Sequence, residues 1–322
     1  MKKFLSATLY WAFLIATAQA DPAKLTIGVL AFGTVNWELA SMRNEGLDRK
    51  YGLDLQVQTL ASPDAGKIGL HADSLDMIVS DWIWVANQQQ TGADYRFIPY
   101  STQAGALMAP ADTKIKGIPD LAGKRLGIVG GPLDKNWILL RALAQKQYGL
   151  NLDAAVEKVF AAPPLLNQQL GDGKLDALLN FWHYAAKLEA QGFHRVMDGR
   201  DIVKRLGFDE PPANLGYVFR RRWGEANKPA LEAFLKASAE ARQRLCDNAA
   251  SWEKIAPLTG EQDEKLQASL RREYCSGLVK HWTAADRQTL ADIYALLRQT
   301  GGDQLTGKAE KLPMEIFWTY SM

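Results

Sequence analysis

The chain has 322 residues, of which 47% are hydrophobic and 23% are charged, and its formal net charge is +2. This balance is typical of a globular protein and excludes a disordered or fibrous chain, and the length gives room for two lobes of ordinary domain size. So small a net charge gives no electrostatic reason to bind nucleic acid or anionic lipid.

The first twenty residues have the pattern of a cleaved signal peptide. Lys2 and Lys3 precede an apolar run over 4–17, and Ala18-Gln19-Ala20 forms a small-x-small cleavage site. The run is too short to span a bilayer, and no cysteine follows the cleavage site to take a lipid. Removal of the leader takes two positive charges from the net +2 and leaves 0. We therefore expect a soluble protein exported to the periplasm.

Short β-rich runs alternate with helical patterns from residue 25 onward. This alternation predicts an α/β fold in which mainly parallel sheets are flanked by helices. Helices are expected at 36–45 and 82–90, and the last strand is expected to be a return crossing. The runs that predict strands are 25–30, 55–60, 75–79, 96–100, 125–129, 156–161, 177–179 and 215–219.

The last part of the chain is predicted to be helical. Pro229 opens a run with apolar residues at helical spacing. Thr283 and Asp286 form a capping-box pattern before a second such run, which Gly301-Gly302 is expected to end. No chemistry is recognisable on these helices, so we expect them to serve packing.

Cys246 and Cys275 are the two cysteines of the chain. An even pair in an oxidising compartment favours a disulfide, which would contribute about 3 kcal/mol. Two buried free thiols or a catalytic thiol are the alternatives, and no neighbouring histidine supports a nucleophile.

An internal repeat at a spacing of one hundred residues predicts two structurally equivalent lobes. Two of the matching pairs of segments contain tryptophan, which occurs only ten times in the chain. These rare matches argue against a coincidence between two units that merely have similar loop lengths. The matching segments are Asn36-Trp37 with Asn136-Trp137, Ala61-Ser62-Pro63 with Ala161-Ala162-Pro163, Leu75-Asp76 with Leu175-Asp176, and Ser80-Asp81-Trp82 with Asn180-Phe181-Trp182.

A ligand site is expected where these repeated segments meet. In open parallel sheets, ligands bind beyond the carboxyl ends of the strands, where loops enter helices. Two such edges that face each other across a hinge form a cleft. The residues expected to bind ligand are Gly33, Thr34, Asn36, Trp37, Ser80, Asp81, Trp82, Tyr100, Gly131, Asp134, Asn136, Trp137, Asn180 and Trp182.

These assignments have structural alternatives. Gly33 permits a tight turn whose backbone N–H groups can hold a polar group, or it belongs to an ordinary strand-to-helix turn. Asp134 either contacts the ligand or caps a helix, and Asp81 is the carboxylate expected in the cleft. Trp82 and Trp182 either stack on a planar or cationic group, at about 0.5–2 kcal/mol per contact, or pack between lobe and helix.

Four segments carry a family resemblance: 25–29 (LTIGV), 75–78 (LDMI), 120–127 (DLAGKRLG) and 173–177 (GKLDA). On these segments the chain resembles the periplasmic solute-binding proteins of ABC importers, of the nitrate, sulfonate and taurine type that includes binders of thiamine pyrimidine precursors. The resemblance covers nearly the whole mature chain and implies a bilobal fold with two crossings between lobes, near 105–108 and 212–217. The expected division is 1–20 signal peptide, 21–105 first part of lobe I, 106–213 lobe II, and 214–322 return to lobe I with C-terminal helices.

The resemblance implies a substrate-binding component that closes its lobes on a small organic solute and passes it to a membrane permease. Aromatic walls with Asn36, Asn136, Asp81 and Asn180 favour a ligand that is uncharged or carries a positive group. The protein is expected to be a monomer without a cofactor. The alternatives are a periplasmic binding protein that serves an enzyme or sensor, and an enzyme of the thiamine-pyrimidine type, whose cysteine-rich motif this chain lacks.

No catalytic or metal-binding motif occurs in the sequence. No Ser-His-Asp set, paired-carboxylate motif or dinucleotide fingerprint is found, so we expect no enzyme activity. His183 either touches ligand or is solvated, and the second interpretation is favoured. Arg220-Arg221-Arg222 is the only dense basic run and is expected to be a solvated strand end. Metal-ligand spacing is missing from the histidines, which are His71, His183, His194 and His281.

Overall fold

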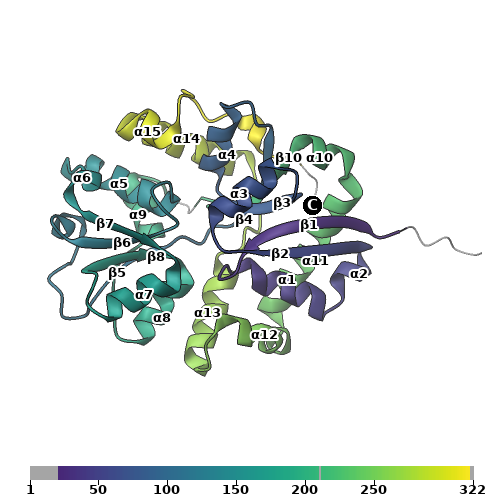
Figure 1. The fold of residues 1–322 in the computed structure, drawn as a ribbon, viewed down its shortest axis with the longest axis horizontal. Coiled ribbons are helices and arrows are strands. Elements are labelled where there is room, and N and C mark those ends of the chain that lie inside the picture. Colours follow the sequence, from purple (N-terminus) through teal and green to yellow (C-terminus); the bar gives the residue numbers. More distant parts are fainter. Residues whose placement is uncertain (1–20, 210–211, 320–322) are drawn as a thin grey trace, which may run out of the picture.

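The computed structural model describes residues 21–209 and 212–319, so the predicted signal peptide lies outside the described residues. Two five-stranded sheets organise the chain into two lobes (Figure 1). Lobe I is built on β2 (Leu53–Leu60), β1 (Ala23–Leu30), β3 (Met77–Ser80), β10 (Leu215–Arg220) and β4 (Tyr95–Ser101), in that order. Lobe II is built on β7 (Glu157–Ala161), β6 (Arg125–Val129), β8 (Ala177–Asn180), β5 (Ala106–Ala109) and β9 (His194–Asp198).

Both sheets are mixed in the same way. In lobe I, β1 pairs in parallel with β2 and β3, and β10 is antiparallel to β3 and β4. In lobe II, β6 pairs in parallel with β7 and β8, and β5 is antiparallel to β8 and β9. Each antiparallel strand is the first strand after the chain has crossed from the other sheet: β5 follows β4, and β10 follows the last helix of lobe II.

Helices flank both sheets, as the alternation in the sequence predicted. Lobe I carries α1 (Val35–Asn44), α2 (Leu47–Lys50), α3 (Pro63–His71) and α4 (Trp82–Gln89). Lobe II carries η1 (Ile118–Leu121), α5 (Lys135–Tyr148), α6 (Leu152–Ala155), α7 (Pro163–Gly171), α8 (Trp182–Ala190) and α9 (Gly199–Leu206). After β10 come α10 (Arg221–Ala226), α11 (Lys228–Asp247), α12 (Ala249–Ile255), η2 (Ala256–Thr259), α13 (Glu264–Ser276), α14 (Ala284–Gly301), α15 (Asp303–Thr306) and η3 (Met314–Ile316).

The two lobes repeat the same order of elements, which confirms the internal repeat. Helices α3 and α7 are displaced by one hundred positions, and so are β3 and β8. The sheet orders β2-β1-β3-β10-β4 and β7-β6-β8-β5-β9 match strand for strand.

The repeated Leu-Asp pair has a structural cause. Asp76 accepts a hydrogen bond from the backbone N–H of Thr26 at 2.8 Å, and Asp176 accepts one from Arg125 at 2.8 Å. Each aspartate thus ties the turn before β3 or β8 to the first strand of its lobe. The preceding residues, Leu75 and Leu175, are buried in the cores. This part of the repeat builds the fold and leaves the ligand site to other residues.

The C-terminal helices contact both lobes (Figure 1). Helix α11 packs on α1 of lobe I, α13 packs on α8 of lobe II, and α14 packs on α5 of lobe II. The expected capping box of Thr283 and Asp286 begins α14. The expected disulfide joins Cys246 near the end of α11 to Cys275 near the end of α13.

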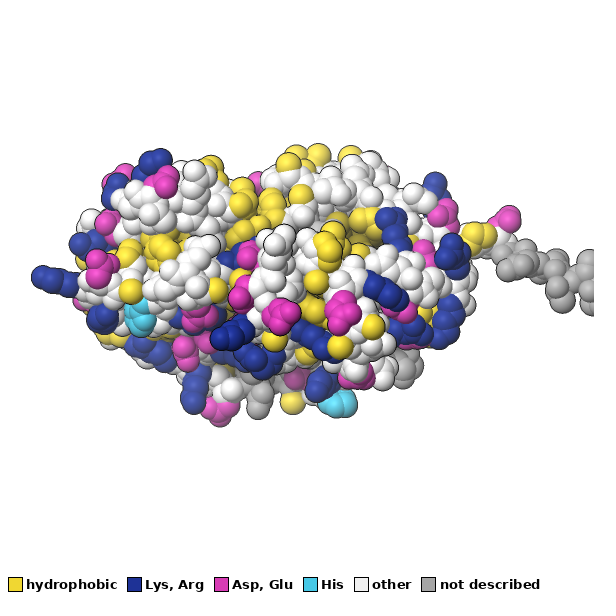
Figure 2. Space-filling view, turned by 90° about the horizontal axis from the view of Figure 1, so that it is seen from below, with side chains coloured by type: hydrophobic (Ala, Val, Ile, Leu, Met, Phe, Trp, Pro, Cys, Tyr) yellow, Lys and Arg dark blue, Asp and Glu magenta, His cyan; other side chains and the backbone are white. Residues whose placement is uncertain are grey.

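The charged residues on the face shown in Figure 2 are interspersed, with Lys and Arg beside Asp and Glu and apolar side chains between them. The basic run at the end of β10 is largely neutralised, because Arg220 and Arg222 pair with Asp73 while Arg221 pairs with Asp94. Within 21–209 and 212–319, no helix has the length and apolar character to cross a bilayer.

Candidate functional site

Strand ends of both lobes meet at a cavity of about 130 Å³. Lobe I contributes the loop after β1, the first part of α3 and the end of β3, and lobe II contributes the turns that lead into α5 and α8. The passage from β4 to β5 forms a further wall. An engineered cavity of about 150 Å³ holds benzene, so this cavity has room for a ligand of about that size.

Three larger hollows lie elsewhere and are weaker candidates. Two of them involve one lobe only: one of about 910 Å³ is lined by β4, α10, α11 and the tail after η3, and one of about 610 Å³ is lined by α11 and Tyr51. The third, of about 460 Å³, lies between α1, β2 and α8 and shares Gly33 and His183 with the cavity. The cavity between the strand ends is therefore the candidate site.

Several of the residues expected to bind ligand do line the cavity, and they come from both lobes. They are Gly33, Thr34, Ser80, Asp81, Tyr100, Asp134, Asn136 and Trp182.

The other expected residues do not line it, and most of them have a structural role instead. The side chain of Asn36 donates to the carbonyl oxygens of Leu30 and Gly33, at 2.6 and 2.8 Å, and so holds the loop after β1. Asn180 is fully buried and donates to Asn167 at 2.7 Å. The remaining ones are Trp37, Trp82, Gly131 and Trp137.

Two of the four repeated tryptophans, Trp37 and Trp182, contact each other between the lobes, and the four do not form a common ligand wall. The rings of Trp37 on α1 and Trp182 on α8 lie edge to face with centroids 5.8 Å apart. Trp82 on α4 and Trp137 on α5 belong to one buried cluster that also contains Tyr294 of α14. Only Trp182 reaches the cavity, so the prediction of duplicated indole walls is corrected to a single indole.

The two aspartates of the cavity cap helices and line the wall at once. Asp81 accepts a hydrogen bond from the N–H of Trp84 at 2.8 Å, and Asp134 accepts from the N–H groups of Asn136 and Trp137 at 2.9 and 3.4 Å. In both cases these hydrogen bonds end on the Oδ1 oxygen, which leaves Oδ2 for a ligand. Burial raises the pKa of Asp134, and the positive charge of the adjacent Lys135 opposes this rise.

Two lysines also line the cavity. Lys67 on α3 is paired with Asp64 at 3.2 Å and lies 5.7 Å from the ring centroid of Trp84. Lys135, at the first position of α5, is only 6% exposed. The cavity therefore contains groups of both signs, one of each from either lobe.

Tyr100 connects the cavity to a buried polar cluster in lobe I. The guanidinium of Arg242 lies 5.8 Å from the Tyr100 ring centroid, and its Nε is 3.8 Å from a carboxylate oxygen of Glu38. Tyr217 donates a hydrogen bond to Glu38 at 2.6 Å. Burial raises the pKa of Glu38, while Arg242 opposes this rise, and burial likewise raises the pKa of Tyr100.

His183 is buried between the lobes, which corrects the expectation of a solvated histidine. His183 belongs to lobe II, and its Nε2–H donates to the carbonyl oxygen of Phe32 in lobe I at 3.0 Å. The residue is 6% exposed. Burial lowers the pKa of His183 to about 3, and Lys187 lowers it as well. The neutral imidazole separates the cavity from the neighbouring hollow, since it lines both.

The passage from lobe I to lobe II is fixed on both sides. The N–H of Gly105 donates to the side chain of Asn136 at 2.9 Å. A Cβ atom at Gly105 would come within 2.4 Å of the carbonyl oxygen of Asn180, so the close approach of β8 requires glycine. Asn136 thus positions the cavity wall from lobe II.

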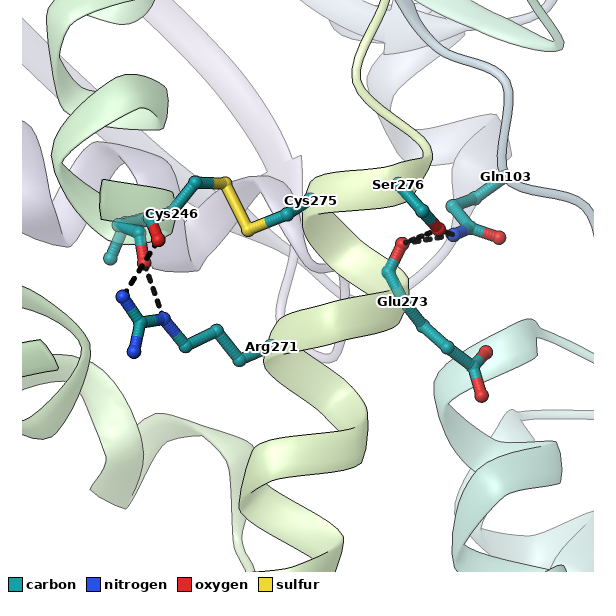
Figure 3. The surroundings of a disulfide bond; sticks show 7 residues. Gln103, Cys246, Arg271, Glu273, Cys275 and Ser276 are labelled. Carbon is teal, nitrogen blue, oxygen red and sulfur yellow. Dashed lines mark hydrogen bonds between the residues drawn. A yellow bond between two sulfur atoms is a disulfide. The ribbon is translucent and has the colours of Figure 1, made fainter. Parts of the chain in front are cut away.

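The end of α13 holds the other side of this passage (Figure 3). Thr102 donates from its N–H to the Gly277 carbonyl at 2.8 Å, and the side chain of Gln103 donates to the Glu273 carbonyl. Figure 3 shows the disulfide on the opposite side of α13, where Arg271 donates to the carbonyl of Cys246 at 2.7 Å. The disulfide therefore fixes the helix that supports the cavity wall.

The sequence analysis missed several lining residues, among them Lys67, Gln103, Leu133 and Lys135. Lys67 follows the repeated Ala-Ser-Pro segment, and Lys135 precedes the repeated Asn-Trp pair, so the repeat itself marked their neighbourhood. Within the described part of the chain, no group of three or more His, Cys, Asp or Glu residues is placed to hold a metal ion.

Comparisons with known proteins agree with this architecture. A family model described as NMT1/THI5 like matches residues 49–250. The alkanesulfonate-binding protein SsuA from Xanthomonas axonopodis pv. citri, bound to MOPS, is 17% identical with a TM-score of 0.73, over 93% of this chain and 99% of that chain. No curated protein sequence matches the chain.

Two further solved structures have the same fold. The periplasmic aliphatic sulphonate binding protein SsuA from Escherichia coli is 18% identical with a TM-score of 0.70, over 93% of each chain. The periplasmic nitrate-binding protein NrtA from Synechocystis PCC 6803 is 15% identical with a TM-score of 0.58, over 74% of this chain and 66% of that chain. At these identities the likeness shows a shared two-lobed fold.

Proposed function

Because the chain belongs to the NMT1/THI5-like family, we propose that it is the periplasmic solute-binding component of an ABC importer. It captures a small organic solute in the cavity between its lobes. The observation that carries this proposal is the cavity itself, which is built from the strand ends of two equivalent lobes and closed by contacts between them.

The lobes open and close about the two passages between the sheets. Lobe I comprises 21–105 and 214–322, and lobe II comprises 106–213. A rotation about the passage at 102–105 and the return of the chain to β10 separates the two walls and admits the solute, and the reverse rotation buries it. The His183 bond to Phe32 and the contact of Trp37 with Trp182 join the two lobes, so opening would break them.

Three observations support a role in import rather than catalysis. The solved structures that share the fold include a periplasmic sulphonate-binding protein and a periplasmic nitrate-binding protein. The sequence begins with a signal-peptide pattern, which directs the product to the periplasm. The acidic groups of the cavity are engaged as helix caps. A monomer that docks transiently on a membrane permease accounts for these features.

Native mass spectrometry of the protein purified from a periplasmic extract tests the proposal. We expect a bound molecule of small mass that dissociates on unfolding. Adding that molecule at a hundred times its dissociation constant should stabilise the protein by about 2.7 kcal/mol. The absence of any ligand, together with no thermal shift in a screen of small periplasmic solutes, would contradict the proposal.

Two tryptophan variants locate the binding site. Trp182→Ala should remove most of the ligand-induced thermal shift, because Trp182 is the one repeated indole that lines the cavity. Trp223→Ala is the matched control, since Trp223 packs against Phe219 on lobe I, away from the cavity. An equal shift in both variants would place the ligand elsewhere.

A further inference from the structure

The ring of Trp37, on α1 of lobe I, lies at the centre of an aromatic cluster between the lobes. Four other rings have their centroids 5.5–6.0 Å from the centroid of its indole. They belong to Trp182 and His183 of α8 in lobe II, to Trp252 of α12 and to Tyr274 of α13. These five residues are called the Trp37 cluster below.

The Trp37 cluster consists of two halves that belong to different lobes. Trp252 and Tyr274 lie on C-terminal helices of lobe I, and the disulfide of Cys275 holds α13 to α11. Trp182 and His183 lie on α8 of lobe II. A rotation that separates the lobes therefore keeps Trp37 against the first half and removes it from the second.

Trp37 takes part in every ring contact that joins the lobes in the described part of the chain. Within 21–209 and 212–319, the ring pairs between lobe I and lobe II are those of Trp37 with Trp182 and with His183. On the other side of the cavity, Trp82 packs against Tyr294, which belongs to the same lobe. One side chain thus carries the aromatic contact across the interface.

Separation of the lobes would expose apolar surface that is now buried. Trp37 is 3% exposed, and its two partners in lobe II are each 6% exposed. Contact of such surface with water is unfavourable. The two pairs are also edge to face, at 83° and 75°, and one such pair changes an equilibrium constant about two- to tenfold beyond the effect of burial. Contacts within the protein therefore favour the closed arrangement before any solute contributes.

The cluster is directly connected to the cavity. Trp182 and His183 both line the cavity, and both pack against Trp37. The rings that would face a solute are thus the rings that hold the lobes together. Opening the cavity to admit a solute breaks the two interlobe contacts of Trp37.

We propose that the Trp37 cluster is a latch that keeps the lobes closed without solute, so that the resting protein is closed and has to open before it captures its solute. The inference rests on the proposed function and deepens it by naming the step at which capture is regulated. The latch contacts are present in the closed protein with and without solute. They therefore slow the association of the solute more than they change its affinity.

Small-angle X-ray scattering of the ligand-free protein tests the inference. Bound solute is removed by unfolding in guanidinium chloride without reductant and refolding, which leaves the disulfide intact, and native mass spectrometry verifies its removal. The wild-type scattering curve should match the curve calculated from the closed structure. A curve that requires separated lobes would overturn the inference.

Trp37→Ala and Trp182→Ala release the latch from opposite sides. Trp37→Ala removes both interlobe pairs and should lower the ratio of closed to open molecules about tenfold or more, which raises the radius of gyration. Trp182→Ala should open fewer molecules, because the pair with His183 remains. The double variant should scatter as Trp37→Ala does, because its second substitution removes no further interlobe pair.

Trp223→Ala is the matched control, since Trp223 packs against Phe219 within lobe I, and it should scatter as the wild type does. If Trp37→Ala fails to fold, Trp182→Ala decides the test, because it leaves lobe I unchanged. A radius of gyration equal to that of the wild type in the folded latch variants would refute the role of Trp37.

The two proposals fail in different ways. Separated lobes in the ligand-free wild type would overturn the latch and leave the solute-binding function intact. Absence of any native ligand would contradict the function, while a closed resting state measured by scattering would still stand.

Discussion

At the scale of single residues, buried ionisable groups concentrate around the cavity. Glu38, Lys135 and His183 are each less than a tenth exposed, and all three lie on or next to the cavity wall. Burial shifts the pKa of Glu38 upward and that of His183 downward, so both shifts favour the neutral forms. Binding and stability should therefore respond to pH through identifiable groups.

His183 should make the closed protein sensitive to acid. Its pKa is about 3 in the structure, and an exposed histidine titrates near 6.5, so protons bind the unfolded or opened form better. The contribution of the neutral imidazole to the free energy of unfolding is complete above pH about 6.5 and is lost as the pH falls toward 3. At pH 5.5 the loss should be about 1.4 kcal/mol. Urea unfolding at pH 7.5 and 5.5 measures it.

His183→Gln isolates this effect, because glutamine keeps a donor for Phe32 and does not titrate. The loss between pH 7.5 and 5.5 should be about 1.4 kcal/mol smaller in His183→Gln than in the wild type. His281→Gln changes an exposed histidine and should behave as the wild type. Identical pH profiles of wild type and His183→Gln would contradict the assignment.

Arg242 should be needed to compensate Glu38. Glu38 is fully buried, and Arg242 is the cation that opposes the burial cost. Arg242→Met leaves a buried carboxyl group without its partner, which should cost about 3–5 kcal/mol in the free energy of unfolding. Arg244→Met, which removes a partly exposed arginine paired with Glu240 and Glu45, should cost clearly less than Arg242→Met, because both of its partners keep a lysine, Lys50 and Lys254. Comparable losses in the two variants would show that Arg242 does not compensate Glu38.

At the scale of elements, α13 links the covalent framework to the cavity. The disulfide fixes its last turn to α11, and the same turn holds Thr102 and Gln103 of the passage between the lobes. Helix α13 also packs on α8, which carries Trp182 and His183. A change in the position of α13 is therefore expected to reach three parts of the cavity wall.

Removal of the disulfide should loosen this support. Cys246 and Cys275 are separated by 29 residues in the sequence, and a loop of this length corresponds to about 3.5 kcal/mol of unfolding free energy. Cys246→Ser with Cys275→Ser should lose that amount and should show faster hydrogen exchange at the amide of Thr102, which donates to Gly277. The amides of β6 serve as the internal control. Unchanged exchange at Thr102 would mean that α13 is held without the disulfide.

The elements were largely predictable from the sequence, because alternating apolar runs and caps are local signals. The predicted strand at 125–129 coincides with β6, and the capping box at Thr283 begins α14. Strands β5 and β9 were missed. Strand β5 has four residues, all buried, and unlike the equally short β8 it has no strand at a spacing of one hundred residues that marks it.

The orientation of the tryptophans was not predictable for a different reason. Trp82 and Trp182 occupy equal positions in the repeat, yet Trp82 packs against Tyr294 and Trp182 against Trp37. These neighbours come from α14 and from the other lobe, so the surroundings depend on tertiary packing that local sequence does not encode.

At the scale of the whole molecule, the two lobes meet on two flanks of the cavity, each with a tryptophan from either lobe. Trp37 and Trp182 meet on one flank, where Tyr274 of α13 joins them. Trp82 and Trp137 belong to the cluster on the other flank, which includes Tyr294 of α14. The two lobes thus contribute equivalent tryptophans to both flanks, and a C-terminal helix, α13 or α14, packs on each flank.

An ion pair strengthens the first flank and should favour the closed arrangement. Lys187 of α8 pairs with Glu261 at 2.9 Å and donates to the carbonyl of Thr259 at 2.7 Å, so it ties lobe II to the C-terminal helices. Both side chains are less than a third exposed, which limits screening by solvent. Lys187→Met should shift the ligand-free protein toward open lobes and increase its radius of gyration in small-angle X-ray scattering.

Lys50→Met provides the matched control, because the ion pair of Lys50 with Glu240 at 2.6 Å joins α2 to α11 within lobe I. Its scattering curve should superimpose on that of the wild type. If Lys187→Met and Lys50→Met scatter alike, the tie between α8 and the C-terminal helices does not govern the position of the lobes.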